Sequence, residues 1–244
     1  MDRLLEATAR AERDHFWFRG FRRFMEPLIA GVAAGRPIEI LDCGCGTGHN
    51  LQMLRRYGRA YGIDLTWAGL QYARRGGDKK VARATVGALP MPDARFDLVT
   101  SFDVLYGLPD AVEQAAITEM ARVLKPGGWA IVNVAALPWL RGNHSVLGGE
   151  LRRYRRQELR EKLEAGGFRV TRTSYTNFSI FPMVAAVRAR QRLSGHVESD
   201  AEISVPSEPI NSVLSALLGL EAIALRVVNM PIGSSVMAVA QKVT

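Results

Sequence analysis

Residues 38 to 64 have the residue types and spacing best suited to binding a small ligand. An apolar run ends in Asp42, three glycines follow at alternate positions from Gly44 to Gly48, and a second apolar run ends in Asp64. Glycine is needed where the backbone turns with a positive φ, or where a ligand must reach the main chain without a Cβ in between. The pattern therefore predicts a strand, a glycine turn, a helix and a second strand around a small ligand.

The spacing of the glycines narrows the class of ligand. A dinucleotide fingerprint requires GxGxxG or GxGxxA, but His49 stands where the third small residue belongs. The chain has GxGxG instead, and Asp64 lies 20 positions after Gly44. An acid at the end of the second strand suits the ribose hydroxyls of an adenosine-containing ligand.

Composition indicates one large α/β domain, since the chain has 244 residues and 48% hydrophobic content. The first ten residues mix both charge signs and lack the apolar core of a signal peptide. Glu221 and Arg226 interrupt the most apolar stretch, residues 213 to 228, below the length needed to span a membrane. We therefore expect a cytoplasmic protein.

Charge and cysteine content bear on partners and metals. The net charge of +8 is spread over several segments rather than gathered in one tail, so nucleic-acid binding is a minor alternative to solvated helix faces. The two cysteines, Cys43 and Cys45, lie inside the glycine turn and lack the spacing of a metal or redox centre. We expect no metal, and interpret them as small residues packed beneath the ligand.

The middle of the chain alternates apolar runs, turns and amphipathic stretches. Strands are expected near 38–42, 60–64, 81–85, 96–101, 128–135, 168–176 and 235–243, and helices near 48–57, 67–76, 111–123 and 156–166. This alternation predicts a doubly wound, Rossmann-like α/β sheet of seven strands, mostly parallel with an antiparallel last strand. Ligands of such sheets bind at the carboxyl ends of the strands, near the switch in strand order.

Four segments make up the expected single domain of residues 1–244. They are an N-terminal helical lid (1–35), a core (36–177), a helical insertion (178–233) and the last strand (234–244). The aromatic segment from His15 to Phe21 fits either a packed helix or a lid over the glycine turn. The apolar insertion fits core or homodimer contacts better than peripheral membrane contact.

Two later motifs give the pattern a family resemblance. The sequences ALPMPDARFDLV (88–99) and RVLKPGG (122–128) follow LDCGCGTG in the order typical of class I S-adenosylmethionine-dependent methyltransferases, which the chain resembles over residues 38–177 and its last strand. The opening HFWFRG and the stretch 140–154 resemble a bacterial subgroup of that family. The resemblance implies S-adenosyl-L-methionine as cofactor and S-adenosyl-L-homocysteine as product.

The resemblance also implies a set of cofactor residues. The residues of the glycine turn would surround the methionine portion, and Asp64 would bind the ribose. Leu65 would flank the adenine, together with Thr85 or Val86, and Phe102 would lie beneath the sulfonium. Thr85 stands where the family often has an Asp for the adenine amino group. The residues expected at the cofactor are Asp42, Gly44, Cys45, Gly46, Gly48, Asp64, Leu65, Thr85, Val86 and Phe102.

Substrate chemistry is expected from loops at the same end of the sheet. Asp103, just past the fourth strand, and His144, past the fifth, are the candidate proton acceptors. A His is more often structural, and relatives carry an acid after this one where the chain has Ser145. The candidate substrate contacts are His15, Trp17, Tyr106, Arg152, Arg153 and Tyr154, with the arginines suited to an acidic group.

Our leading functional hypothesis is methyl transfer to a small or medium-sized metabolite, such as a natural-product, lipid or sugar-linked intermediate. An RNA methyltransferase using the basic surface is an alternative, although no NPPY-type tetrapeptide follows the fourth strand. The third hypothesis is a cofactor-binding scaffold protein that lacks catalysis and acts through the apolar insertion.

Overall fold

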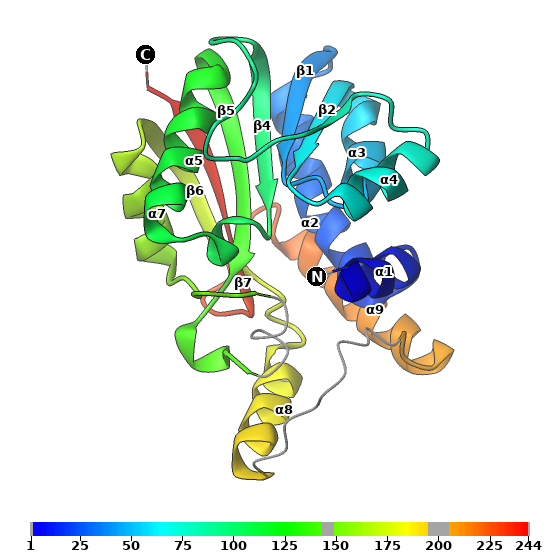
Figure 1. Cartoon of the computed structure of the whole chain (residues 1–244). Helices are drawn as coiled ribbons and strands as arrows, with labels where there is room; N and C mark the ends of the chain where they lie inside the picture. Colours follow the sequence, from blue (N-terminus) through cyan, green and yellow to red (C-terminus); the bar gives the residue numbers. More distant parts are fainter. Residues whose placement is uncertain (1, 143–148, 195–204, 244) are drawn as a thin grey trace.

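The computed structural model describes residues 2–142, 149–194 and 205–243. Its centre is a seven-stranded sheet with the order β3-β2-β1-β4-β5-β7-β6 (Figure 1). The strands are β1 (Ile38–Cys43), β2 (Gly58–Asp64), β3 (Val81–Arg83), β4 (Phe96–Phe102), β5 (Leu124–Ala135), β6 (Phe168–Thr176) and β7 (Ser235–Lys242). The first five strands pair in parallel, and β7 lies antiparallel between β5 and β6. The predicted doubly wound, Rossmann-like sheet is confirmed.

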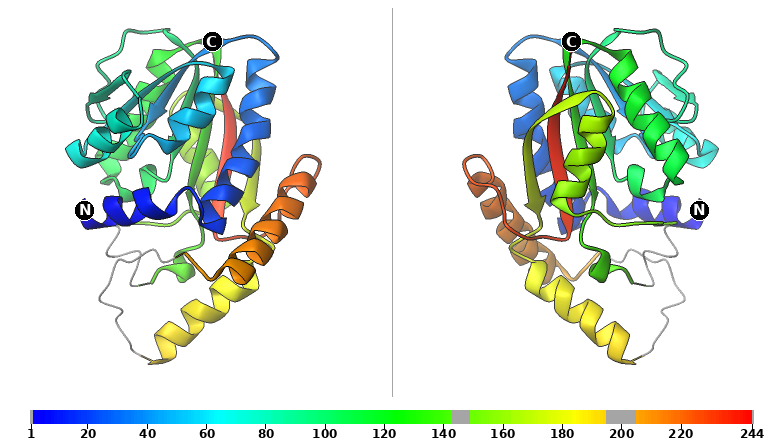
Figure 2. Two further views of the ribbon diagram at one scale, coloured as in Figure 1. Left: turned by 90° about the vertical axis from the view of Figure 1, so that its right-hand side faces the viewer. Right: turned by 90° about the vertical axis from the view of Figure 1, so that its left-hand side faces the viewer.

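Helices cover both faces of the sheet because the strands of a parallel sheet are apolar on both sides. α5 and α7 lie on one face, and α2, α3 and α4 on the other (Figures 1 and 2). The helices are α1 (Asp2–Ala11), α2 (Phe16–Ala33), α3 (His49–Leu54), α4 (Trp67–Arg75), α5 (Asp110–Val123), α7 (Arg156–Ala165), α8 (Phe181–Ser194) and α9 (Glu208–Ala224). Three short 3-10 helices are η1 (Arg55–Tyr57), η2 (Leu105–Gly107) and η3 (Pro138–Leu140). No helix in the described ranges is long and apolar enough to cross a membrane.

The N-terminal segment forms two helices, where the sequence pattern predicted one. His15 interrupts the helix with an extended backbone (φ −67°, ψ 131°), and its Nδ1 accepts a hydrogen bond from the backbone N–H of Trp17 at 3.2 Å. His15 therefore caps the start of α2. Its ring also stacks on Phe16, with a centroid separation of 4.4 Å.

α9 and α2 pack together although about 190 residues separate them in the sequence. A Cβ added to Gly20 of α2 would lie 2.4 Å from Leu218 Cδ1 of α9, so this close approach requires glycine. Asn211, at the start of α9, accepts a hydrogen bond from the N–H of Phe16 at 2.8 Å and donates one to the carbonyl of Asp14 at 2.9 Å. α1, α8 and α9 all lie toward the carboxyl ends of the parallel strands (Figure 1).

Candidate cofactor and substrate site

The glycine turn after β1 has the backbone conformation that its sequence predicts. Gly44, Gly46 and Gly48 have φ values of +86°, +50° and +82°. A Cβ on Gly44 would lie 2.2 Å from Val104 Cγ2, whereas a Cβ on Gly46 would meet nothing within 4 Å. The turn is therefore packed at Gly44 against Val104, which directly precedes η2, and is open at Gly46, where no side chain covers the main chain.

Asp64, at the end of β2, fixes the shape of this turn. Its Oδ2 accepts a hydrogen bond from the N–H of Gly46 at 2.8 Å, and its Oδ1 accepts from the N–H and hydroxyl of Thr66. A carboxylate offers about four acceptor positions, so these three bonds leave capacity for a ligand hydroxyl. The ribose contact of Asp64 stays a prediction, and the structure adds an anchoring contact to the turn.

Asp42, at the end of β1, is a buried acid beneath the turn. It is 1% exposed, and its Oδ1 accepts a hydrogen bond from Thr100 Oγ1 at 2.7 Å. Its Oδ2 is buried without a partner among the described residues. Burial raises the pKa of Asp42 to about 7, the bond from Thr100 lowers it, and the charge of Asp64 raises it further. An uncompensated acid beneath an open turn fits a cationic ligand above it.

The two cysteines are packing residues rather than reactive groups. Cys43 and Cys45 are buried, and the side chain of Cys45 fills the space beside Gly62 of β2, where a Cβ would lie 2.7 Å from its Sγ. Burial raises the pKa of both thiols far above their usual range, so neither forms a thiolate near neutral pH. The side chain of Cys45 thus packs against β2, and its contact with the cofactor stays a prediction.

The residues predicted to flank the adenine surround the next strand ends. Leu65, immediately after β2, is 62% exposed, so its side chain is free to contact a flat ring. Thr85 is exposed and accepts a bond from the N–H of Gly87 at 3.3 Å, while Val86 is buried. Phe102, at the end of β4, is buried edge-on against Phe21 of α2, with a centroid separation of 5.0 Å.

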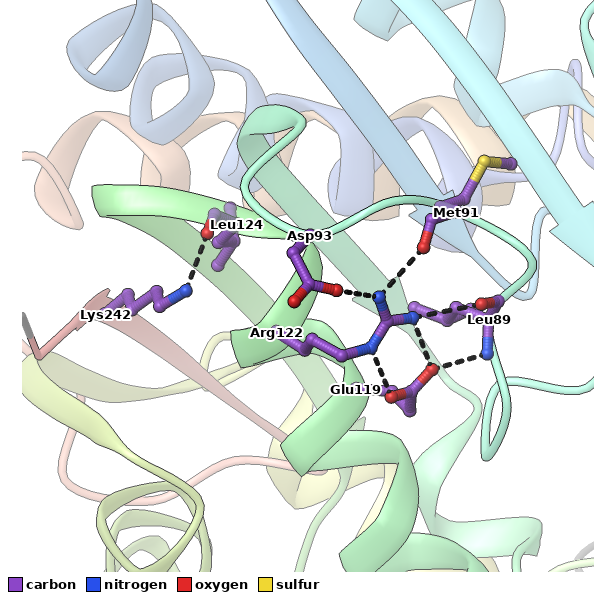
Figure 3. A network of polar contacts seen from close by, with 7 residues as sticks. All are labelled: Leu89, Met91, Asp93, Glu119, Arg122, Leu124 and Lys242. Atoms are coloured by element: carbon purple, nitrogen blue, oxygen red, sulfur yellow. Dashed lines mark hydrogen bonds and ion pairs between the residues drawn. The ribbon is translucent and has the colours of Figure 1, made fainter.

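Arg122, the first residue of the RVLKPGG motif, holds the loop that follows β3 (Figure 3). Arg122 donates to both carboxylate oxygens of Glu119, at 2.6 and 2.8 Å, and to the carbonyls of Leu89 and Met91, at 3.0 and 2.9 Å. Asp93 pairs with the same guanidinium. The motifs at 88–99 and 122–128 are thus parts of one hydrogen-bonded unit, which positions the segment containing Thr85 and Val86.

Asp103, one of the two predicted proton acceptors, follows β4 directly. It has a left-handed backbone (φ +60°), and its N–H donates to the carbonyl of Asn133 at 2.9 Å. Asn133 Nδ2 donates back to Asp103 Oδ1 at 3.1 Å. Asp103 is accessible to solvent, yet protein atoms crowd its carboxylate, and this desolvation raises its pKa to about 7. Glu150 raises that pKa further, and Arg153 lowers it.

Arg153 and Glu150 form a buried ion pair beside Asp103. Arg153 donates to Glu150 Oε1 at 2.6 Å and to Oε2 at 3.0 Å, and it also donates to the carbonyl of Ala136 at 3.2 Å. In this two-point contact, two N–H groups along one edge of the planar guanidinium donate to the two oxygens of the carboxylate. The sequence predicts that Arg153 binds an acidic group of the substrate. In the structure, its acidic partner is Glu150 of the same chain. Tyr106 lies in the same surroundings, and its burial and the nearby acids raise the pKa of its hydroxyl.

Two residues predicted to contact substrate bind Glu113 of α5 instead. Tyr154 has no exposed surface, and its hydroxyl donates to Glu113 Oε1 at 2.7 Å. Arg152 pairs with Glu113 and Asp110, and Lys162 of α7 also donates to Glu113. The structure therefore corrects the expected position of Arg152 and Tyr154. Their polar groups join α5 to α7 because Glu113, buried at 1% exposure, requires partners for its charge.

The N-terminal helices reach the glycine turn through a residue that sequence reasoning missed. The hydroxyl of Thr47 hydrogen-bonds to the carboxylate of Glu12, with both carboxylate oxygens at 2.7 Å. His15 and Trp17 are half-buried on the adjoining segment, and burial lowers the pKa of His15. The helix pattern of residues 2–30 gave no sign of this contact, and the lid function of the segment stays a prediction.

The other candidate proton acceptor, His144, lies outside the described residues. Among those described, the neighbours of Asp103 that sequence reasoning missed are Asn133 and Glu150. Asn133 interrupts an apolar strand, and a polar residue in such a run is the one local signal that pointed to it.

The strand order, the glycine turn between β1 and α3 and the acids at successive strand ends together define a class I methyltransferase fold. Residues 41–132 match the family model described as a methyltransferase domain. Over these residues the chain is similar to the class I S-adenosylmethionine-dependent methyltransferases, a family whose cofactor is S-adenosyl-L-methionine.

Similar proteins agree with this assignment. The chain is 30% identical over 164 residues to a probable S-adenosylmethionine-dependent methyltransferase of Mycolicibacterium smegmatis, covering 66% of this chain and 62% of that protein. It is 39% identical over 108 residues to a demethylmenaquinone methyltransferase of Tropheryma whipplei, covering 43% of this chain and 44% of that protein. The match therefore spans 62% or less of the length of these relatives. A SAM-dependent methyltransferase from Archaeoglobus fulgidus shares the fold, with a TM-score of 0.61, 16% identity and coverage of 92% and 94% of the two chains.

Proposed function

We propose that this protein transfers the methyl group of S-adenosyl-L-methionine to a small or medium-sized metabolite, such as a natural-product, lipid or sugar-linked intermediate. The observation that supports the proposal most is the placement of acids around one open glycine turn. Asp42 and Asp64 end β1 and β2, Asp103 follows β4, and Gly46 leaves the backbone open between them. A relative named for demethylmenaquinone supports a small-molecule acceptor.

The proposed cofactor residues fit the parts of S-adenosyl-L-methionine. Asp42 and the backbone of the turn would hold the cationic methionine portion, with Asp42 acting through its charge because it is buried. Asp64 would bind the ribose, and Leu65 with Val86 would flank the adenine. Glu12, His15 and Trp17 would cover this side of the site from the N-terminal helices.

The cofactor supplies a methyl group on a positively charged sulfur, which is already a good leaving group. The protein must therefore hold the acceptor atom in line with that methyl group and exclude water, and such orientation supplies about 7 to 11 kcal/mol of a reaction barrier. In our proposal, Asp103 accepts the proton that an oxygen, nitrogen or carbon acceptor loses. Its pKa of about 7 suits this step near neutral pH, and Asn133 orients its carboxylate.

Replacement of Asp64 tests the cofactor site directly. We expect Asp64→Ala to weaken binding of S-adenosyl-L-homocysteine by ~10-fold to ~100-fold in a calorimetric titration, since a hydrogen bond to a charged group is lost. Glu164→Ala, on the solvent side of α7, is the matched control and should bind normally. Because Asp64 also anchors the turn, the thermal stability of each variant is measured in parallel. Unchanged affinity in Asp64→Ala would exclude the proposed ribose contact.

A further inference from the structure

α9 carries an apolar face that faces solvent in the structure. Val213, Leu220 and Ile223 of α9 are 61%, 65% and 62% exposed, and Val227, three residues past the end of the helix, is 85% exposed. The opposite side of the helix packs on α2, where Leu218 is fully buried. A contiguous exposed face of this kind is typical of an interaction surface.

The exposed face of α9 carries no charge. Between Glu208 and Arg226, the one charged residue in the sequence is Glu221, and it is buried. Its carboxylate accepts bonds from the N–H groups of Phe178 and Ser179 at 2.9 Å, so it belongs to the inner side of the helix. The two flanking charges, Glu208 and Arg226, are exposed at opposite ends of the apolar face.

The exposed apolar residues lie along one side of α9. Val213, Ala216, Leu220 and Ile223 follow one another at intervals of three, four and three. Residues at this spacing share one side of a helix and can pack against a second helix. α9 already packs on α2 with its other side, so this side is available to a partner.

The face is complementary to itself when two copies run antiparallel. With a twofold axis level with residue 218, Val213 of one copy faces Ile223 of the second, and Ala216 faces Leu220, a small residue against a large one. The same arrangement places Glu208 of each copy beside Arg226 of the other. A parallel pair would instead place like charges together at both ends, which is unfavourable.

We propose that α9 is the interface of a homodimer, in which two copies of the helix pack antiparallel through their apolar faces. The closed twofold symmetry is the commonest form of homo-oligomer and uses the same surface on both copies. Since α9 also packs on α2, the dimer would support the N-terminal helices that contact the glycine turn. The inference depends on the geometry of α9 and is independent of the proposed reaction.

Sedimentation equilibrium of the full chain tests the interface. We expect the wild-type protein to be a dimer, and Leu220→Glu to weaken dimerisation by ~10-fold or more, because a charge then lies at the centre of an apolar contact. Leu220 is 65% exposed, so the folded protomer tolerates the change, as circular dichroism will verify. Val187→Glu, at a 48% exposed apolar position on α8, is the matched control and should remain dimeric. A monomeric wild-type protein, or a dimeric Leu220→Glu variant, would overturn the proposal.

A charge exchange tests the antiparallel arrangement. Glu208→Arg and Arg226→Glu should each weaken the dimer, and the double variant should restore it, because both end contacts are then re-formed with reversed sign. Failure of the double variant to recover would exclude this arrangement. Co-sedimentation with phosphatidylglycerol vesicles distinguishes a lipid surface as the occupant. A monomeric protein that binds the vesicles through Leu220 would also overturn the homodimer.

Discussion

Two acids of the site, Asp42 and Asp103, have the same raised pKa but differ in their exposure to solvent. Burial raises the pKa of Asp42 and of Asp103 to about 7. Asp42 lies beneath the turn with almost no exposed surface, so it responds to a charge placed above it but exchanges no proton with a substrate. Asp103 is accessible and held by Asn133, so it can accept a proton from a bound molecule. Equal pKa values thus serve different purposes at these two positions.

Replacement of Asp103 separates catalysis from binding. We expect Asp103→Asn to lower kcat by about 100-fold or more for an acceptor that must lose a proton, with little change in cofactor affinity. The wild-type rate should rise with pH through about 7 as Asp103 ionises, and the variant should lose this rise. Steady-state rates from pH 5.5 to 8.5 measure both effects. A variant with full activity and the same pH profile would show that Asp103 is not the base.

Replacement of Asp42 tests the buried charge through stability. Its folded pKa of about 7 exceeds the ordinary aspartate value of 3.8, so between these values the unfolded chain ionises while the folded one stays protonated. Wild-type stability should therefore fall as pH rises across this interval, and Asp42→Asn should lack that fall. The variant should gain roughly 2 to 3 kcal/mol over the wild type between pH 5 and pH 8 in urea titrations. Equal pH dependence of the two proteins would contradict the raised pKa.

At the scale of elements, Arg122 connects two parts of the chain that lie about 30 residues apart in the sequence. Its guanidinium joins the C-terminal end of α5 to the loop after β3 through Leu89 and Met91 (Figure 3). The bidentate contact with Glu119 lowers the pKa of that acid and fixes the orientation of the guanidinium. The loop holding Thr85 and Val86 is therefore positioned from outside the site.

Arg122→Met should weaken this positioning without removing a ligand contact. We expect a loss of about 2 kcal/mol or more in unfolding free energy, since two backbone carbonyls and Glu119 lose their donor. Affinity for S-adenosyl-L-homocysteine should also fall, because the adenine side of the site becomes less ordered. Arg160→Met, at an exposed pair on α7, is the control. A destabilised variant with normal affinity would show that the loop does not line the site.

At the scale of the whole molecule, segments from both ends of the chain meet beside the glycine turn. Glu12, between α1 and α2, contacts Thr47 of the turn, and α9 from the insertion holds the N-terminal segment through Asn211. Together these contacts link the insertion to the glycine turn. Under the proposed function, these segments would cover the cofactor site and bound the substrate space.

Asn211→Ala should loosen this cover. Asn211 is 1% exposed, and its loss leaves the N–H of Phe16 and the carbonyl of Asp14 without their partner, at a cost of about 1 to 3 kcal/mol. Limited proteolysis should cut the variant more rapidly near the junction of α1 and α2. Ser212→Ala, the exposed neighbour on α9, should behave as wild type. Unchanged stability and proteolysis would show that α2 is held by other contacts.

The fold could be predicted from local patterns because strands, turns and helices depend on residues close in sequence. The apolar runs ending in Asp42 and Asp64 are strands, and the glycines between them have the positive φ values that their spacing requires. The break at His15 was missed because histidine is not among the preferred helix-capping residues and the apolar pattern continues through it. A capping contact depends on geometry that periodicity does not record.

The sequence by itself determined the class of fold and indicated the cofactor, since these follow from glycine spacing and from motifs that each lie within a few residues; the strand ends expected to hold the cofactor stay a prediction. Tertiary structure alone decided which polar side chains face the site. The sequence predicts that Arg152 and Tyr154 contact substrate, but in the structure both donate hydrogen bonds to Glu113, about 40 positions earlier. Asn133 was inconspicuous and bonds to Asp103. A buried charge binds whichever partner the fold brings near, and that partner is set by packing rather than by distance along the chain.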